Sequence, residues 1–196
     1  MLTNEDILQV YVDAEAILKG HFQLASGRHS DTYMQSAKLF MYPEKTKLLC
    51  GELAQKLKAN GITVDGVVSP AIGGIIMGYE MANQLSVPNI YYERVNGEMM
   101  LRRGFTVEAG KRYLVVEDVV TTGGSVKEVA DLVEKAGGIV ECISSVVDRS
   151  NGKVDFSRRY IPLLSTEVVS WEACDCELCK KGIPVQKPGT KATQAK

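Results

Sequence analysis

The sequence lacks any apolar run of the roughly 18 residues that a membrane-spanning helix needs. Its first residues, MLTNEDILQV, lack the basic start of a secretion signal. The 23 Lys and Arg residues nearly balance the 24 Asp and Glu residues, so bulk charge predicts neither a nucleic-acid nor a membrane partner. These absences favour a soluble, cytoplasmic protein.

Two common nucleotide-binding patterns are also missing. No G-x-G-x-x-G stretch occurs, which argues against a Rossmann site, and no Gly-Lys-Ser/Thr occurs, which argues against a Walker loop. The chain has no internal repeat and no low-complexity segment.

The cysteines are few, odd in number and unaccompanied by a secretion signal, which argues against a disulfide framework. Cys50 and Cys142 fall in helix-like and strand-like patterns and are expected to be buried thiols. Cys174, Cys176 and Cys179 are candidate zinc ligands because Cys176-x-x-Cys179 has a zinc-binding spacing. The fourth ligand of a closed site would be Cys50, a histidine or a residue of a partner subunit; reduced thiols without metal are the alternative.

Apolar strand patterns alternate with amphipathic helix patterns along the chain. Helices are predicted over 3–20, 43–61, 71–85 and 124–138, and strands over 64–70, 88–95, 112–120, 139–150 and 159–166. Continuous apolar strands interleaved with helices predict one α/β domain with a mainly parallel sheet covered on both faces. Extra pieces are expected at both ends: about 1–40 as a small hood, 41–165 as the core, and 166–196 as a cysteine-bearing lobe ending in a mobile tail over 187–196.

The segment VVEDVVTTGGS, over 115–125, combines an acid pair with an anion-binding loop. Reading Tyr113 to Val116 as the strand places Glu117 and Asp118 at its carboxyl edge, where open parallel sheets bind ligands. The Thr-Thr-Gly-Gly-Ser turn into the next helix offers backbone N–H groups, hydroxyls and the positive helix end to a phosphate. Acids that accept hydrogen bonds from a ribose diol, beside a loop that holds the 5′-phosphate, fit a ribose 5-phosphate. Two solvated acids and an ordinary turn are the alternative.

This segment resembles the phosphoribosyl-pyrophosphate (PRPP) signature of type I phosphoribosyltransferases. GHFQLASGRHSDTYMQSA, over 20–37, resembles the N-terminal signature of the orotate branch of that family. SPAIGG, over 69–74, resembles the diphosphate loop, and VVDRS, over 146–150, resembles the strand end that contacts orotate. The matches span 20–150 and imply the type I phosphoribosyltransferase fold, transfer of a phosphoribosyl group to orotate in UMP synthesis, Mg²⁺ as cofactor and a homodimer.

The resemblance also implies site residues. The orotate contacts are Ser26, Tyr33, Met34, Thr121 and Arg149; the PRPP contacts are Ala71, Gly73, Arg94, Arg102, Arg103, Glu117, Asp118, Val119, Val120, Thr121, Thr122, Gly123, Gly124 and Ser125. Glu117, Asp118 and Arg94 are the catalytic candidates, and Mg²⁺ would be held mainly through PRPP. A guanidinium suits the orotate carboxylate because its planar fork donates two hydrogen bonds; an Arg149–Asp148 ion pair is the alternative.

The hairpin from Arg94 to Phe105, with Asn96-Gly97 at its tip, is the candidate lid whose arginines reach the pyrophosphate on closure. A solvated basic hairpin is the alternative. Many relatives have lysine where this chain has Ala25 and Gly73, and a longer loop with lysine and histidine. We therefore expect a short-loop branch in which arginines replace those lysines.

Other assignments remain open at the level of sequence. His29 either touches ligand or is structural, and His21 is expected to be structural. A purine phosphoribosyltransferase and a PRPP-sensing regulator on the same fold are the alternative functions.

Overall fold

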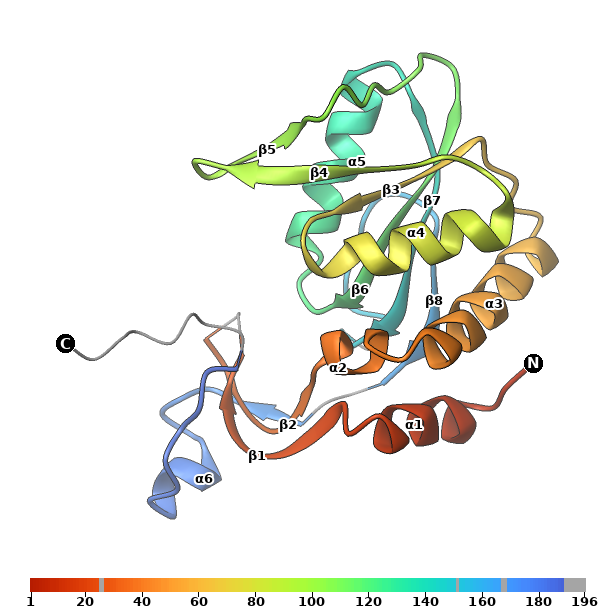
Figure 1. The fold of residues 1–196 in the computed structure, drawn as a ribbon. Helices are drawn as coiled ribbons and strands as arrows, with labels where there is room; N and C mark the ends of the chain where they lie inside the picture. Colours follow the sequence, from red (N-terminus) through yellow and green to blue (C-terminus); the bar gives the residue numbers. More distant parts are fainter. Residues whose placement is uncertain (25–26, 151, 167–168, 189–196) are drawn as a thin grey trace.

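A six-stranded sheet in the order β5-β4-β3-β6-β7-β8 forms the centre of the molecule. The computed structural model describes residues 1–24, 27–150, 152–166 and 169–188 (Figure 1). The strands are β3 (Gly66–Pro70), β4 (Asn89–Val95), β5 (Glu98–Leu101), β6 (Arg112–Val120), β7 (Ile139–Asp148) and β8 (Tyr160–Ser165). All pairings are parallel except the β4–β5 hairpin, so the predicted mainly parallel sheet is confirmed.

Helices cover both faces of this sheet (Figure 1). α3 (Pro43–Ala59) and α4 (Gly73–Leu85) pack on one face, and α5 (Gly124–Lys135) packs on the other. Successive side chains of a strand point to opposite faces of the sheet, so one strand contributes to the cores on both faces. Leu114 and Val116 join the core with α3 and α4, whereas Val115 between them joins the core with α5.

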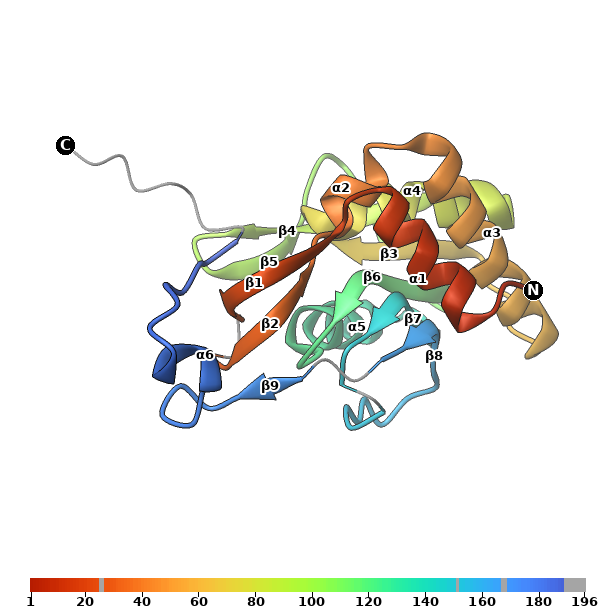
Figure 2. The ribbon, with the colours of Figure 1, turned by 90° about the horizontal axis from the view of Figure 1, so that it is seen from below.

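A smaller antiparallel sheet lies beside the carboxyl ends of the central strands and is called the hood here (Figures 1 and 2). It contains β1 (Ile17–Gln23), β2 (His29–Met34) and β9 (Ser170–Trp171) in the order β1-β2-β9. Two short helices accompany it: α2 (Ser36–Phe40) after β2, and α6 (Glu177–Lys180) after β9. The hood therefore joins the two ends of the chain above one edge of the sheet.

The predicted opening helix over 3–20 is too long. α1 covers only Asn4–Asp13, is capped by Thr3, and is followed by Glu15 with a positive φ of 50°. Ile17 to Gln23 instead forms β1, because its backbone groups pair with β2, a non-local interaction that overrides local helix propensity. Within the described ranges, no helix has the length and apolar character to cross a bilayer.

Candidate active site

The acid pair lies on the last part of β6, inside the predicted 112–120 strand, and not beyond a strand that ends at Val116. β6 continues through Val120 because β7 stays paired with it that far; Glu117 lies opposite Ser145 and Val120 opposite Asp148. Both carboxylates are partly buried at the carboxyl edge of the sheet. The acid pair therefore lies on a strand inside the sheet, with β3 and β7 as its neighbours.

Burial raises the pKa of both acids. The negative charge of Asp118 and the hydrogen bond with it raise the pKa of Glu117 further, whereas that hydrogen bond lowers the pKa of Asp118. Burial and the like charges therefore disfavour full ionisation of the ligand-free pair. Asp118 is also hydrogen-bonded to Ser36 of α2, whose Oγ lies 3.5 Å from the hydroxyl of Tyr11 in α1.

The loop after β6 forms a small cavity of about 150 Å³, called the phosphate cradle here. Its lining comprises Glu117, Val119, Val120, Thr121, Thr122, Gly123, Gly124, Ser125 and Val126. α5 begins at Gly124 without a side-chain cap, so its first N–H groups are available to an anion. Gly123 has φ 73°, and a Cβ there would lie 2.5 Å from the Phe156 ring. Only glycine satisfies both conditions.

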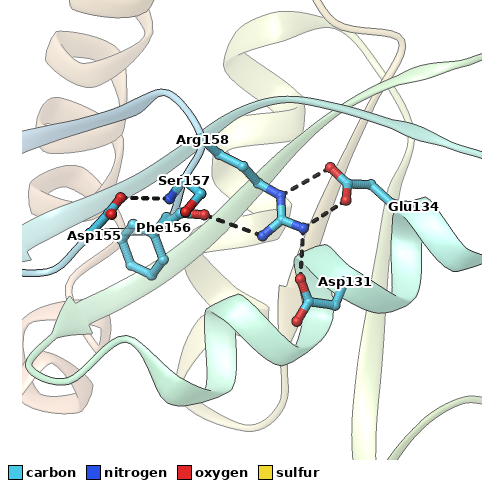
Figure 3. A network of polar contacts seen from close by, with 6 residues as sticks. All are labelled: Asp131, Glu134, Asp155, Phe156, Ser157 and Arg158. Atoms are coloured by element: carbon cyan, nitrogen blue, oxygen red, sulfur yellow. Dashed lines mark hydrogen bonds and ion pairs between the residues drawn. The ribbon is translucent and has the colours of Figure 1, made fainter.

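The loop carrying Phe156 is fixed behind the cradle by Arg158 (Figure 3). The Arg158 guanidinium donates to Glu134 at 2.9 and 2.6 Å and to Asp131 at 2.6 Å, and both acids belong to α5. A further bond of 3.4 Å joins Arg158 to the Phe156 carbonyl. The network therefore ties α5 and the Phe156 loop together, which limits how far the ring can move from Gly123.

A larger cavity of about 680 Å³ separates the hood from the acid pair and is called the base pocket here. It is lined by Gln23, Leu24, Gly27, Tyr33, Met34, Gln35, Ser36, Ala37, Asp118, Val119, Thr121, Arg149, Lys187 and Pro188. The predicted contacts Tyr33, Met34, Thr121 and Arg149 are therefore brought together, whereas Ser26 lies outside the described residues.

Arg149 is the most informative residue of this pocket. Its Nε and Nη2 are buried and have no hydrogen-bond partner among the described residues, and burial lowers its pKa. The alternative pairing with Asp148 is not seen, because that carboxylate accepts bonds from Ser150 and from the Gly152 N–H. A buried guanidinium with open donors is the complement of an anionic ligand.

Sequence reasoning missed several wall residues. Three of them, Gln35, Ser36 and Ala37, are the last residues of the N-terminal signature over 20–37. Their membership of that signature could have identified them as pocket residues. Lys187 and Pro188 were assigned to a mobile tail, yet they line the base pocket. A backbone bridge between Phe22 and Gln186 brings them there, and no local pattern reveals such a pairing.

The predicted diphosphate loop lies against the acid pair. α4 begins at Gly73 without a side-chain cap, so its N-terminus presents open N–H groups. A Cβ on Gly73 would lie 3.1 Å from the Asp118 Oδ1. A larger side chain here would crowd the Asp118 carboxylate.

The hairpin arginines, by contrast, are engaged elsewhere. Arg94 donates to the Gly97 carbonyl and to Glu128, each at 2.6 Å. Arg103 donates to Glu93 at 2.7 Å, and Arg102 lies 3.9 Å from the same carboxylate. None of the three lines the phosphate cradle or the base pocket.

Comparison with known proteins identifies the class to which this fold and site belong. Residues 43–172 match the phosphoribosyl transferase domain family, so the chain is a phosphoribosyltransferase. The chain is 49% identical over 191 residues to an orotate phosphoribosyltransferase of Chlorobaculum parvum, covering 97% of this chain and 98% of that one. It is 50% identical to an orotate phosphoribosyltransferase of Pelotomaculum thermopropionicum over 190 residues, or 97% of this chain and 99% of the relative. The chain belongs to the orotate phosphoribosyltransferase family, the pentosyltransferases of pyrimidine biosynthesis.

A solved structure supports the same fold at greater distance. The orotate phosphoribosyltransferase of Aeropyrum pernix superposes with a TM-score of 0.65 at 21% identity, covering 81% of this chain and 93% of that one. The predicted type I phosphoribosyltransferase architecture is thus confirmed.

Proposed function

We propose that this chain transfers the 5-phosphoribosyl group of PRPP to N1 of orotate, giving orotidine 5′-monophosphate and pyrophosphate. The observation that carries the choice of base is Arg149, whose buried and unpartnered donors line a pocket beside the phosphate cradle. Orotate supplies the carboxylate that such a group needs, and uracil and the purine bases do not. Tyr33, on the hood side of the same pocket, offers a ring face to the pyrimidine.

The adjoining elements suit the parts of PRPP. The phosphate cradle would hold the 5′-phosphate through the N–H groups at the start of α5. Glu117 and Asp118 would accept hydrogen bonds from the ribose hydroxyls, and the open N-terminus of α4 beside Asp118 would face the pyrophosphate. PRPP would then extend along the carboxyl edge of the sheet, with its C1 toward the base pocket.

Catalysis in such a site rests on position and charge. Bond breaking at C1 leaves positive charge on the ribose, and negative charge on the acid pair would stabilise it at short range. Fixing both substrates on β6, α5 and the hood removes much of the entropic barrier to their reaction. Covering the pocket with the hood limits hydrolysis of PRPP by water. No side chain has to act as a nucleophile.

The donor set also fits Mg²⁺, the cofactor that the family implies. Mg²⁺ prefers oxygen ligands and substrate phosphates, and the acid pair offers carboxylate oxygens in a site whose burial makes a cation favourable. Glu117 and Asp118 would contact it through the ribose hydroxyls of PRPP. When bound, the ion would neutralise charge on the departing pyrophosphate. Homodimeric assembly and a cytoplasmic location stay predictions.

The direct test is loss of orotate absorbance when PRPP and Mg²⁺ are added, run in parallel with uracil, adenine and hypoxanthine. We expect turnover with orotate alone. Turnover with a purine would support a purine phosphoribosyltransferase instead. PRPP binding by calorimetry without turnover of any base would support a PRPP-sensing regulator and overturn the proposal.

A further inference from the structure

The hood contains a second cluster of reactive side chains, and none of its members lines the base pocket. His21 of β1, His29 of β2, Cys176 at the start of α6 and Cys179 within α6 place one potential ligand atom each within 4.8 Å of all the others. His21, His29 and Cys176 are buried, with 1%, 6% and 0% of their surfaces exposed. Four such groups from three separate segments do not meet through local sequence preference.

The distances between these atoms match those between the ligands of one small cation. The His21 Nε2 lies 2.9 Å from the His29 Nδ1, 3.4 Å from the Cys176 Sγ and 3.7 Å from the Cys179 Sγ. The Cys179 Sγ lies 3.3 Å from the His29 Nδ1. In tetrahedral zinc sites with ordinary Zn–N and Zn–S bonds, neighbouring ligand atoms lie about 3.3–3.8 Å apart. The distances between the four potential ligand atoms are therefore close to those in a tetrahedral zinc site.

The hydrogen bond on the far side of His21 orients that ring as a ligand. The His21 Nδ1 lies 2.6 Å from the Ile183 carbonyl oxygen, which can only accept, so Nδ1 carries the proton and donates it. The Nε2 of the neutral ring then has a lone pair directed at the other three groups. A backbone carbonyl that accepts from the outer nitrogen is the usual support of a metal-bound histidine. Without a cation, one lone pair would have to serve three neighbours.

We propose that His21, His29, Cys176 and Cys179 form a structural zinc site that fastens the C-terminal segment to the β1–β2 hairpin. Two thiolates and two neutral imidazoles match Zn²⁺ in charge and softness, and binding releases the two thiol protons to solvent. Cys174 is exposed and outside the cluster, so the earlier candidate set is corrected: two histidines replace it and complete the coordination. Cys50 is buried in the main core.

The site has a consequence for the base pocket. His21 and His29 lie on either side of Leu24 and Gly27 in the chain. The segment after Cys179 returns to β1, where the Gln186 N–H donates to the His21 carbonyl at 2.8 Å. Lys187 and Pro188 follow directly and line the base pocket together with Leu24 and Gly27. The zinc site would therefore hold both walls of the hood side of that pocket.

The first experiment measures metal in protein purified without an affinity tag or chelator. We expect close to one zinc per chain by plasma mass spectrometry in the wild type and in Cys174→Ser, and a loss of at least tenfold in Cys176→Ser and Cys179→Ser. Cys174→Ser is a matched control because it removes a neighbouring thiol that lies outside the cluster. Wild-type protein that holds no zinc after dialysis against Zn²⁺, or that contains a Cys176–Cys179 disulfide by intact mass, would overturn the proposal.

A second measurement uses only wild-type protein, in case the cysteine variants do not fold. Replacement by Co²⁺ should give the strong visible bands of a tetrahedral ion and a near-ultraviolet thiolate-to-cobalt band. Weak octahedral bands would contradict the site. Neither readout depends on turnover, so failure here is distinct from failure of the proposed reaction. Removal of zinc should raise the KM for orotate more than the KM for PRPP; the reverse order would contradict the link between the zinc site and the base pocket.

Discussion

The phosphate cradle and the hood face each other across one pocket, but the chain builds them in opposite ways. The cradle comes from a single run, β6, the Thr121–Gly123 turn and the start of α5, and rests on a parallel sheet. The hood is assembled from both ends of the chain, and its β9 has only two residues. A contiguous site depends on local backbone geometry, whereas a composite site depends on long-range ties such as the proposed zinc site. Substitutions should therefore fail in different ways in the two regions.

The largest effect is expected for Gly123→Ala in the cradle. The new Cβ would meet the Phe156 ring at 2.5 Å in a backbone conformation with φ 73°. Because Arg158 fixes the Phe156 loop, the backbone of the cradle has to move. We expect a loss of about 2–4 kcal/mol of unfolding free energy and at least about 100-fold in kcat/KM for PRPP. Urea denaturation and steady-state kinetics measure these two effects.

Gly61→Ala is the control that separates the steric cost of Gly123→Ala from the cost of placing alanine at a positive φ. Gly61 also has a positive φ, 74°, but an added Cβ there would meet no described atom within 4 Å other than those of Gly61 and its chain neighbours. The Gly61→Ala variant should lose only about 1 kcal/mol of unfolding free energy and keep the wild-type kcat/KM. Equal losses in the two variants would show that packing against Phe156 does not define the cradle.

The same contrast explains what the sequence could predict. The order of strand, acid pair, Gly-rich turn and helix identified the cradle residues, because that site is local. The sequence missed Lys187 at the base pocket and did not select His21 and His29 as partners of Cys176 and Cys179. Those contacts depend on pairing between residues more than 140 positions apart. It also extended α1 into β1, since only the non-local pairing with β2 makes that segment a strand.

Arg149 lies where the two regions meet, and its replacement should change base recognition without unfolding the protein. Arg149→Gln should lower kcat/KM for orotate about 10²–10³-fold, the value of two charge-assisted hydrogen bonds. Thermal stability should stay equal or rise, because the substitution removes two buried guanidinium nitrogens, Nε and Nη2, that have no hydrogen-bond partner in the described part of the chain. Arg149→Lys keeps the charge but not the planar fork, so its kcat/KM for orotate should lie between the values of the wild type and Arg149→Gln. An unchanged KM for orotate in both variants would refute the base-site assignment.

A smaller effect, confined to turnover, is expected for the hairpin. We keep the hypothesis that Arg94 and Arg103 leave their glutamate partners and reach the pyrophosphate when the hairpin closes. Arg94→Ala, alone or with Arg103→Ala, should lower kcat about tenfold while orotate affinity stays within about twofold. Glu128→Gln is the matched control, because it removes the Arg94 ion pair and leaves the arginine. Kinetics unaltered by loss of both arginines would remove the hypothesis.

The smallest effect is on stability and concerns the acid pair, Glu117 and Asp118, of β6. Burial and the neighbouring Asp118 raise the pKa of Glu117, so the folded protein binds a proton that the unfolded chain releases. The free energy of unfolding of the wild type should therefore fall as pH rises from the ordinary glutamate pKa to the raised pKa of Glu117. Above the raised pKa, no further loss from this group is expected. Glu117→Gln removes this dependence and should raise the Tm of the ligand-free protein by about 2–5 °C at pH 8, with no gain at pH 4. Parallel Tm-versus-pH curves for wild type and Glu117→Gln would contradict a raised Glu117 pKa and show that burial does not favour the protonated acid.

Glu93→Gln is the contrasting variant and should lower the Tm at neutral pH. The hydrogen bond from Arg103 lowers the pKa of Glu93 and therefore stabilises the fold when this carboxylate is ionised.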